Sequence, residues 1–78
     1  MANKIILYTA PGCVYCQMVK DFFKLNNIFY EEKDVSVDEK AREEMVAKSG
    51  QLGVPVIDID GKIVVGFDES AIKELLKL

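Results

Sequence analysis

The order of apolar and polar positions divides the first half of the chain into two extended runs around one amphipathic run. Residues 4–9 form a short apolar run, and the Pro and Gly at 11–12 would end a helix or strand there. This pattern predicts a buried strand. On a helical wheel, residues 14–25 place their apolar side chains on one broad arc, which predicts a half-buried helix. Asn26-Asn27 is expected to end that helix before a second strand at 28–34. The apolar arc contains Val14, Tyr15, Cys16, Met18, Val19, Phe22, Phe23 and Leu25.

The middle of the chain predicts a second helix with weak packing. Ser36 and Glu39 have the spacing of a capping box, and Gly50 is a suitable stop after a helix that runs to about Ser49. The apolar stripe of this helix is narrow, so we expect it to cover the sheet lightly. The stripe consists of Val37, Ala41 and Met45.

The last third of the chain predicts a hairpin followed by a helix. Residues 54–59 and 62–65 are β-branched runs on either side of Asp60-Gly61, a strong hairpin signal. Asp68 is expected to cap a final amphipathic helix through Leu78. The predicted order is βαβαββα, an α/β arrangement in which the first strand, helix and strand form a right-handed crossover unit.

Composition and charge narrow the class of protein. The chain has 78 residues, of which 50% are hydrophobic and 29% charged, so we expect one globular domain spanning residues 1–78. Ten Lys and Arg face thirteen Asp and Glu, and this net charge of −3 argues against a nucleic-acid partner. No apolar run is long enough to span a membrane, and residues 1–5 do not form a secretory signal. We therefore expect a cytoplasmic monomer.

Two cysteines carry the candidate chemistry. Cys13 and Cys16 stand three residues apart where the predicted strand has ended and the helix begins, so they can close into a disulfide with little backbone movement. The N–H groups and partial positive charge of a helix N-terminus favour a thiolate at Cys13. Cys13 lies beside the polar arc of the wheel and Cys16 at the edge of the apolar arc. We expect Cys13 to be the exposed nucleophile and Cys16 the more buried resolving thiol.

Metal binding and purely structural roles are less favoured for the cysteine pair. A zinc site needs four ligands, but the chain has two Cys and no His, so it could form only across a dimer. A structural disulfide between residues three apart would close almost no loop entropy. Two unrelated free thiols are a third alternative. Lys20 is expected to lie too far along the helix to contact Cys13, and the acidic run at 31–34 is expected to be a solvated strand edge.

Four short motifs, in order and spacing, resemble the glutaredoxin branch of the thioredoxin superfamily. The motifs are Tyr8-Thr9, Cys13-Val14-Tyr15-Cys16, Val54-Pro55 and Gly66-Phe67-Asp68. Residues 49–61 are most similar to the small NrdH-type and YruB-type glutaredoxin-like redoxins. The resemblance implies the thioredoxin/glutaredoxin fold, a four-stranded mixed sheet with helices on both faces. It also implies a thiol-disulfide oxidoreductase that reduces protein disulfides and carries electrons between partners.

The resemblance also implies a binding groove beside the two cysteines. Val54-Pro55 is then a cis peptide whose Val54 backbone can pair with an extended substrate or cofactor. The alternative is an ordinary proline at the start of an edge strand. Tyr15 either stacks on a bound partner or packs in the core, and Asp68 either meets a glutathione ammonium or caps the last helix. The residues implied for the groove are Tyr15, Val54, Pro55, Gly66, Phe67 and Asp68.

Departures from the glutaredoxin pattern concern glutathione. Residues 9–12 lack the basic residue that usually precedes the first cysteine, and Gly53 stands where a threonine is usual, so the carboxylate clamp looks incomplete. We expect no tightly bound cofactor and either thioredoxin reductase or glutathione as the electron source, the former being favoured. Ribonucleotide reductase is one candidate substrate. The alternative function is a [2Fe-2S] cluster bridged through Cys13 in a dimer, which would require external thiols.

Overall fold

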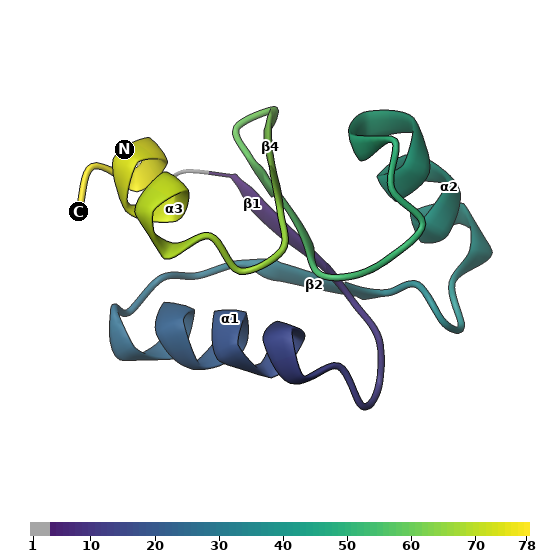
Figure 1. Cartoon of the computed structure of the whole chain (residues 1–78), viewed down its shortest axis with the longest axis horizontal. Helices are drawn as coiled ribbons and strands as arrows, with labels where there is room; N and C mark the ends of the chain where they lie inside the picture. Colours follow the sequence, from purple (N-terminus) through teal and green to yellow (C-terminus); the bar gives the residue numbers. More distant parts are fainter. Residues whose placement is uncertain (1–3) are drawn as a thin grey trace.

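A computed structural model describes residues 4–78, so residues 1–3, part of the segment considered for a secretory signal, lie outside it. The predicted order of elements is confirmed within the described part (Figure 1). The elements are β1 (Ile5–Thr9), α1 (Val14–Leu25), β2 (Glu31–Asp34), α2 (Glu39–Ser49), β3 (Val56–Ile59), β4 (Lys62–Val65) and α3 (Glu69–Leu76). Among these helices none is both long and apolar enough to cross a membrane.

The strands form one mixed sheet in the order β2-β1-β3-β4. β1 pairs with β2 in parallel and with β3 antiparallel, and β3 pairs antiparallel with β4. The parallel pair is the predicted crossover unit, and the antiparallel pair is the predicted hairpin, in which Asp60 and Gly61 both have positive φ. This is the four-stranded mixed sheet that the resemblance implied.

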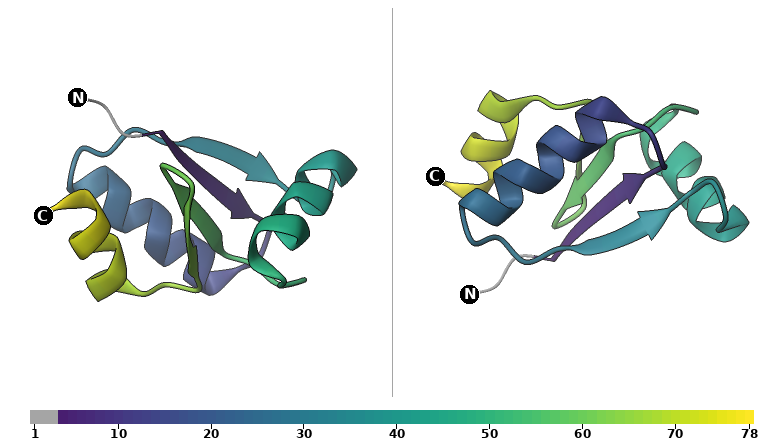
Figure 2. Two further views of the ribbon diagram at one scale, coloured as in Figure 1. Left: turned by 90° about the horizontal axis from the view of Figure 1, so that it is seen from above. Right: turned by 90° about the horizontal axis from the view of Figure 1, so that it is seen from below.

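The helices cover both faces of the sheet, as expected (Figure 2). Side chains on a strand alternate between faces, and all five residues of β1 are buried. Ile5 and Leu7 join a core cluster with residues of α1 and α3, whereas Ile6 and Tyr8 join a second cluster with Ala41 of α2 and its neighbours. β1 is therefore the central buried strand, and the loop at its carboxyl end leads directly to Cys13.

The start of α2 corrects the sequence prediction. The N-cap is Asp38, whose carboxylate accepts the Ala41 N–H at 3.0 Å, and not Ser36. The Ser36 hydroxyl instead donates to the Asp34 carboxylate at 2.6 Å, because Asp34 ends β2 two residues before it. Val37 consequently precedes the helix and is 82% exposed, so it is not part of the buried stripe.

Several predicted boundaries and buried positions also shift. The bounds of α1 are as predicted, but the sheet covers only part of its apolar arc. Cys16, Val19, Phe22 and Phe23 are buried, whereas the exposed members are Val14, Tyr15, Met18 and Leu25. β2 begins at Glu31 rather than at residue 28, and α3 ends at Leu76. The acidic β2 lies at the edge of the sheet and is largely solvated, as predicted.

Candidate active site

Cys13 is positioned by the turn that joins β1 to α1. The loop after Thr9 reverses at Gly12, which has φ +76°, a conformation that favours glycine. Cys13 is then the N-cap of α1, with extended backbone, and its sulfur accepts the Cys16 N–H at 3.1 Å. The two cysteines are joined in a disulfide, with Cα atoms 5.2 Å apart. Both sulfurs therefore lie at the N-terminus of α1, as the spacing of the two cysteines predicted.

The two sulfurs differ in accessibility. Cys16, in the first turn of α1, is 1% exposed, whereas Cys13 is half-buried. A reagent or partner disulfide approaching from solvent therefore reaches Cys13 first. This asymmetry of burial agrees with the division that the helical wheel predicted.

The electrostatic surroundings of Cys13 favour an anion. The first turn of α1 contains no acidic residue to oppose the partial positive charge of the helix terminus. A hollow of about 410 Å³ beside Cys13 is lined by one charged side chain, that of Lys20. When the disulfide is open, the Cys16 N–H and the helix terminus both stabilise a Cys13 thiolate.

The start of β3 forms a second wall of the site. The Val54–Pro55 peptide is cis, as the resemblance implied. The Val54 carbonyl oxygen lies 3.8 Å from the Cys13 sulfur, a contact rather than a hydrogen bond while that sulfur is in the disulfide. The Gly66 N–H donates to the Pro55 carbonyl oxygen at 2.9 Å, which joins the loop after β4 to the same corner.

The other residues implied for the groove have identifiable positions. Tyr15 is 61% exposed next to the disulfide, so the interpretation that it packs in the core is wrong. The Phe67 ring lies edge-on to the Phe22 ring, with centroids 6.0 Å apart, and packs against the core. Asp68 accepts the Ala71 N–H at 3.1 Å, which is the predicted helix cap. The exposed Tyr15 ring is thus free to meet a partner, whereas Phe67 and Asp68 also support the fold.

Sequence reasoning missed the solvent face of α1. Gln17 and Lys20 line the same hollow as Cys13, a position that was predicted for neither. The Lys20 ammonium is held 2.8 Å from the Glu32 carboxylate of β2. The available signal was the spacing 13, 17, 20, because steps of four and three residues place side chains on one stripe of a helix.

Metal and cluster binding depend on the ligands available. Within residues 4–78, no group of three or more His, Cys, Asp or Glu side chains lies together. Cys16 is buried behind Cys13, so one chain offers a single accessible thiol to an iron–sulfur cluster. The remaining ligands of a cluster would have to come from a second copy and from external thiols.

Comparison with known proteins agrees with this geometry. The sequence model of the glutaredoxin family matches residues 5–64. A glutaredoxin-like 8.6 kDa protein from the rubredoxin operon of Clostridium pasteurianum is 44% identical over 73 residues, which cover 94% of this chain and 97% of that protein. Glutaredoxin 3 of Escherichia coli K12 is 33% identical over 88% of this chain and 82% of its own length. A mutant of the thioredoxin-like protein BC3987 superposes with a TM-score of 0.90 and 39% identity, covering 95% of both chains.

Proposed function

Because this chain belongs to the glutaredoxin family and is a thiol-disulfide oxidoreductase, we propose that it reduces protein disulfides by dithiol exchange, with Cys13 as the attacking thiol. The observation that carries this proposal is the asymmetry of the pair. The Cys13 sulfur is reachable and accepts the Cys16 N–H, whereas Cys16 is 1% exposed. Cys16 is then the resolving thiol.

The proposed reaction has two exchange steps. The Cys13 thiolate attacks one sulfur of the substrate disulfide, a mixed disulfide forms, and the other substrate sulfur leaves as a thiolate that takes a proton. The Cys16 thiolate then attacks the Cys13 sulfur, which closes the Cys13–Cys16 disulfide and releases the second substrate thiol. Two electrons and two protons pass from the protein dithiol to the substrate. The Cα separation of 5.2 Å lets the second step occur without a rearrangement of the helix.

The second wall of the site suits an extended substrate. The Val54 carbonyl oxygen lies 3.8 Å from the Cys13 sulfur, and Val54 is only half-buried just before β3. A substrate segment that carries its cysteine to Cys13 therefore passes beside the Val54 backbone and can pair with it as an added strand. The exposed Tyr15 ring lies two residues after Cys13, in the first turn of α1.

The electron source in this proposal is a flavoenzyme of the thioredoxin reductase type rather than glutathione. The loop at 10–12 has no charged residue, and Lys20 is the single cation that lines the hollow at Cys13. Glutathione carries two carboxylates, so this hollow offers it an incomplete set of cations. A protein reductant makes contact over a larger surface and depends less on such a clamp.

Two parallel assays test the proposed function. The oxidised protein is supplied with NADPH and either thioredoxin reductase or glutathione plus glutathione reductase, and NADPH consumption is followed with a protein disulfide as substrate. We expect turnover with thioredoxin reductase and little with glutathione, and none with Cys13→Ser in either assay. Turnover by Cys13→Ser would contradict the assignment of the nucleophile. Turnover with glutathione alone would retain the exchange reaction but overturn the proposed reductant.

A further inference from the structure

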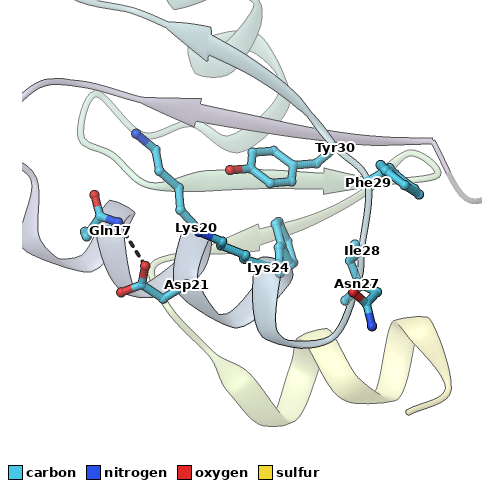
Figure 3. Close-up of a pocket in the computed structure, with 9 residues that line it drawn as sticks. Gln17, Lys20, Asp21, Lys24, Asn27, Ile28, Phe29 and Tyr30 are labelled. Atoms are coloured by element: carbon cyan, nitrogen blue, oxygen red, sulfur yellow. Dashed lines mark hydrogen bonds between the residues drawn. The ribbon is translucent and has the colours of Figure 1, made fainter.

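The hollow beside Cys13 continues along the solvent face of α1. A second hollow of about 430 Å³ lies between α1 and the segment that follows it (Figure 3). Gln17 and Lys20 line both hollows, so the two share a wall. We call the combined feature the α1 groove. It is lined by residues 10–14, Gln17, Lys20, Asp21, Phe23, Lys24 and residues 27–30.

The charges of the α1 groove favour an acidic ligand close to the cysteines. Lys20 is the single charged residue of the hollow at Cys13. Lys24 and Asp21 are added in the second hollow, and the Asp21 carboxylate there accepts the Gln17 amide at 3.0 Å. The lining thus holds two lysines and one acid, and the Glu32 carboxylate that pairs with Lys20 lies outside the lining.

The Lys20 ammonium is held by an ion pair that a ligand can replace. It lies 2.8 Å from the Glu32 carboxylate, and the two side chains are 27% and 44% exposed. Ion pairs of this exposure contribute little to stability, so an incoming carboxylate can take the place of Glu32 at low cost. The pair directs the Lys20 ammonium from α1 toward β2.

The far end of the α1 groove carries an exposed aromatic side chain. Phe29 is 91% exposed in the segment before β2, and Figure 3 shows it at the opposite end of the second hollow from the Lys20 ammonium. The neighbouring Tyr30 packs on Phe23, with ring centroids 5.0 Å apart, and both side chains line the second hollow. Exposed aromatic residues at the edge of a hollow are typical anchors for protein partners.

We propose that the α1 groove binds an acidic, extended segment of the disulfide-bearing substrate, with a substrate carboxylate on Lys20 and an apolar side chain on Phe29. This inference rests on the proposed exchange reaction, because the segment must continue from the substrate cysteine attacked by Cys13. The path from Cys13 to Lys24, which lines the same second hollow as Phe29, is about 16 Å long at 1.5 Å per helical residue, so about five extended substrate residues reach that hollow. Lys20 thus selects among disulfides by the charge that surrounds them.

Three synthetic peptides test the charge preference. Each has one cysteine joined by a disulfide to 2-mercaptoethanol, and the residues on both sides are Glu, Gln or Lys in otherwise equal sequences. The protein is reduced beforehand and freed of reductant, and the rate constant of peptide reduction is measured in a single turnover at low salt. We expect the Glu peptide to react about three- to tenfold faster than the Gln peptide and the Lys peptide to be slowest. The preference should fall sharply at about 1 M salt, where the screening length is about 3 Å.

Variants assign this preference to Lys20. Lys20→Gln is expected to reduce the Glu-to-Gln rate ratio to near one, while Glu32→Gln raises it because Lys20 is then unpaired. In the double variant the effect of Glu32→Gln should largely disappear. The matched control is Lys40→Gln, which removes a charge from an exposed position on α2, on the other face of the sheet, and should leave the ratio unchanged. A purely structural Lys20–Glu32 pair would instead make the two single variants behave alike.

The outcomes separate this inference from the function on which it rests. If none of the peptides is reduced, the exchange reaction itself is contradicted. If all are reduced but the Glu-to-Gln ratio is near one, or is unchanged in Lys20→Gln, the acidic-segment proposal is overturned and the exchange reaction stands.

The distal anchor has its own test. Two Glu peptides are compared that carry either Leu or Ser five residues from the cysteine on both sides. We expect the Leu peptide to react severalfold faster with the original protein and this advantage to be lost in Phe29→Ser. Equal rates for the two peptides, or an advantage that survives Phe29→Ser, would remove Phe29 from the binding surface.

Discussion

The Cys13 sulfur has two roles, as the N-cap of α1 and as the proposed nucleophile. Helix N-caps usually use the oxygen of Ser, Thr, Asp or Asn, but here a sulfur accepts the Cys16 N–H at 3.1 Å. The sulfur that caps the first turn of α1 is therefore also the sulfur that, in our proposal, attacks the substrate. Opening the disulfide leaves that N–H directed at a thiolate, which is the stronger acceptor.

Thr9, at the end of β1, contains a polar atom without a partner. The side chain is 2% exposed, and its hydroxyl makes no hydrogen bond to any of residues 4–78. Thr9→Val keeps the branched shape and replaces this hydroxyl by a methyl group, so we expect the free energy of unfolding to rise by about 1 kcal/mol. Urea unfolding of the oxidised protein measures the change.

Thr9→Ser is the matched control for that substitution. It keeps the hydroxyl and removes the methyl group from a buried site, so it should lower the free energy of unfolding by about 1 kcal/mol. A loss of stability in Thr9→Val would instead show that the hydroxyl has a partner.

At the residue scale, the positions of the two cysteines were predictable from the sequence, but contacts between side chains of different elements were not. The positions of Cys13 and Cys16 follow from spacing and from the breakers before them. The role of Lys20 at the α1 groove depends on Glu32, which the parallel register of β1 and β2 brings beside the helix. The register of two paired strands cannot be predicted from a local sequence pattern.

At the scale of elements, α2 is attached to the sheet by a small apolar cluster and a polar network. Ala41 and Met45 are its buried residues. Its last turn adds the Lys48 ammonium, which donates to the Tyr8 hydroxyl at 2.9 Å and to the Asp58 carboxylate at 2.8 Å. These hydrogen bonds, led by the one to Asp58, raise the pKa of Lys48, which therefore stays charged across the ordinary pH range. The narrow apolar stripe of α2 predicted light packing on the sheet. The hydrogen bonds of Lys48 to Tyr8 and Asp58 add to this attachment.

Removing the ammonium should weaken the attachment of α2. Tyr8 is fully buried and Asp58 is 7% exposed, so in Lys48→Met the buried Tyr8 hydroxyl loses its donor and the Asp58 carboxylate keeps only the Gly61 N–H. We expect the free energy of unfolding to fall by about 2 kcal/mol in urea titrations. Lys40→Met, at an exposed position of the same helix, should change it by less than about 0.5 kcal/mol. Equal effects of the two substitutions would contradict the network as the anchor of α2.

The cap of α2 gives a second prediction at this scale. Asp38→Ala should lower the free energy of unfolding by about 1 kcal/mol because the Ala41 N–H loses its acceptor. Ser36→Ala should cost less, since the Ser36 hydroxyl donates to Asp34 in an exposed turn. Thermal or urea unfolding of both variants measures this order, and the reverse order would restore Ser36 as the cap.

The cap also shows why element boundaries were less predictable than elements. The capping-box spacing predicted Ser36 as the cap, but Asp34 ends β2 close enough to bind the Ser36 hydroxyl, and Asp38 caps the helix instead. The bounds of α1 were predictable because its breakers and its apolar period are local. The exposure of Val14 and Met18 was not, because it depends on how much of the helix the sheet covers.

In the whole molecule, the sheet topology assembles the site from distant segments. Cys13 follows the carboxyl end of β1, and Val54–Pro55, which comes just before β3, lies beside it. The Gly66 N–H joins the loop after β4 to Pro55. The crossover and the hairpin were predictable from the residues, but the pairing of β1 with β3, which joins them into one sheet, was implied by the family resemblance alone.

Stability of the whole fold should decrease in acid. Burial raises the pKa of Asp58, but the hydrogen bonds from Lys48 and from the Gly61 N–H outweigh it, so the pKa lies below its ordinary value of 3.8. A carboxyl group with a lowered folded-state pKa stabilises the fold above its unfolded-state pKa, and this stability is lost as the pH falls through the folded-state value. We therefore expect the urea midpoint to fall between about pH 5 and about pH 2.

The variant Asp58→Asn isolates that contribution. It should be less stable than the original protein near pH 7 and should lose less stability on acidification, because the titrating group has been removed. The original protein and Asp58→Asn are compared by urea unfolding across this pH range. Parallel acid profiles of the two proteins would exclude Asp58 as a source of the pH dependence.

The central claim is that Cys13 attacks and Cys16 resolves, and trapping the intermediate tests it most directly. Each single variant, Cys16→Ser and Cys13→Ser, is reduced and mixed with an equimolar disulfide-bonded peptide, and the intact mass of the protein is followed in time. We predict that Cys16→Ser rapidly accumulates a mixed disulfide with the peptide, because the exposed Cys13 reacts and nothing resolves it, whereas Cys13→Ser remains unmodified. A mixed disulfide that forms as fast on Cys13→Ser, or on neither variant, would contradict the account.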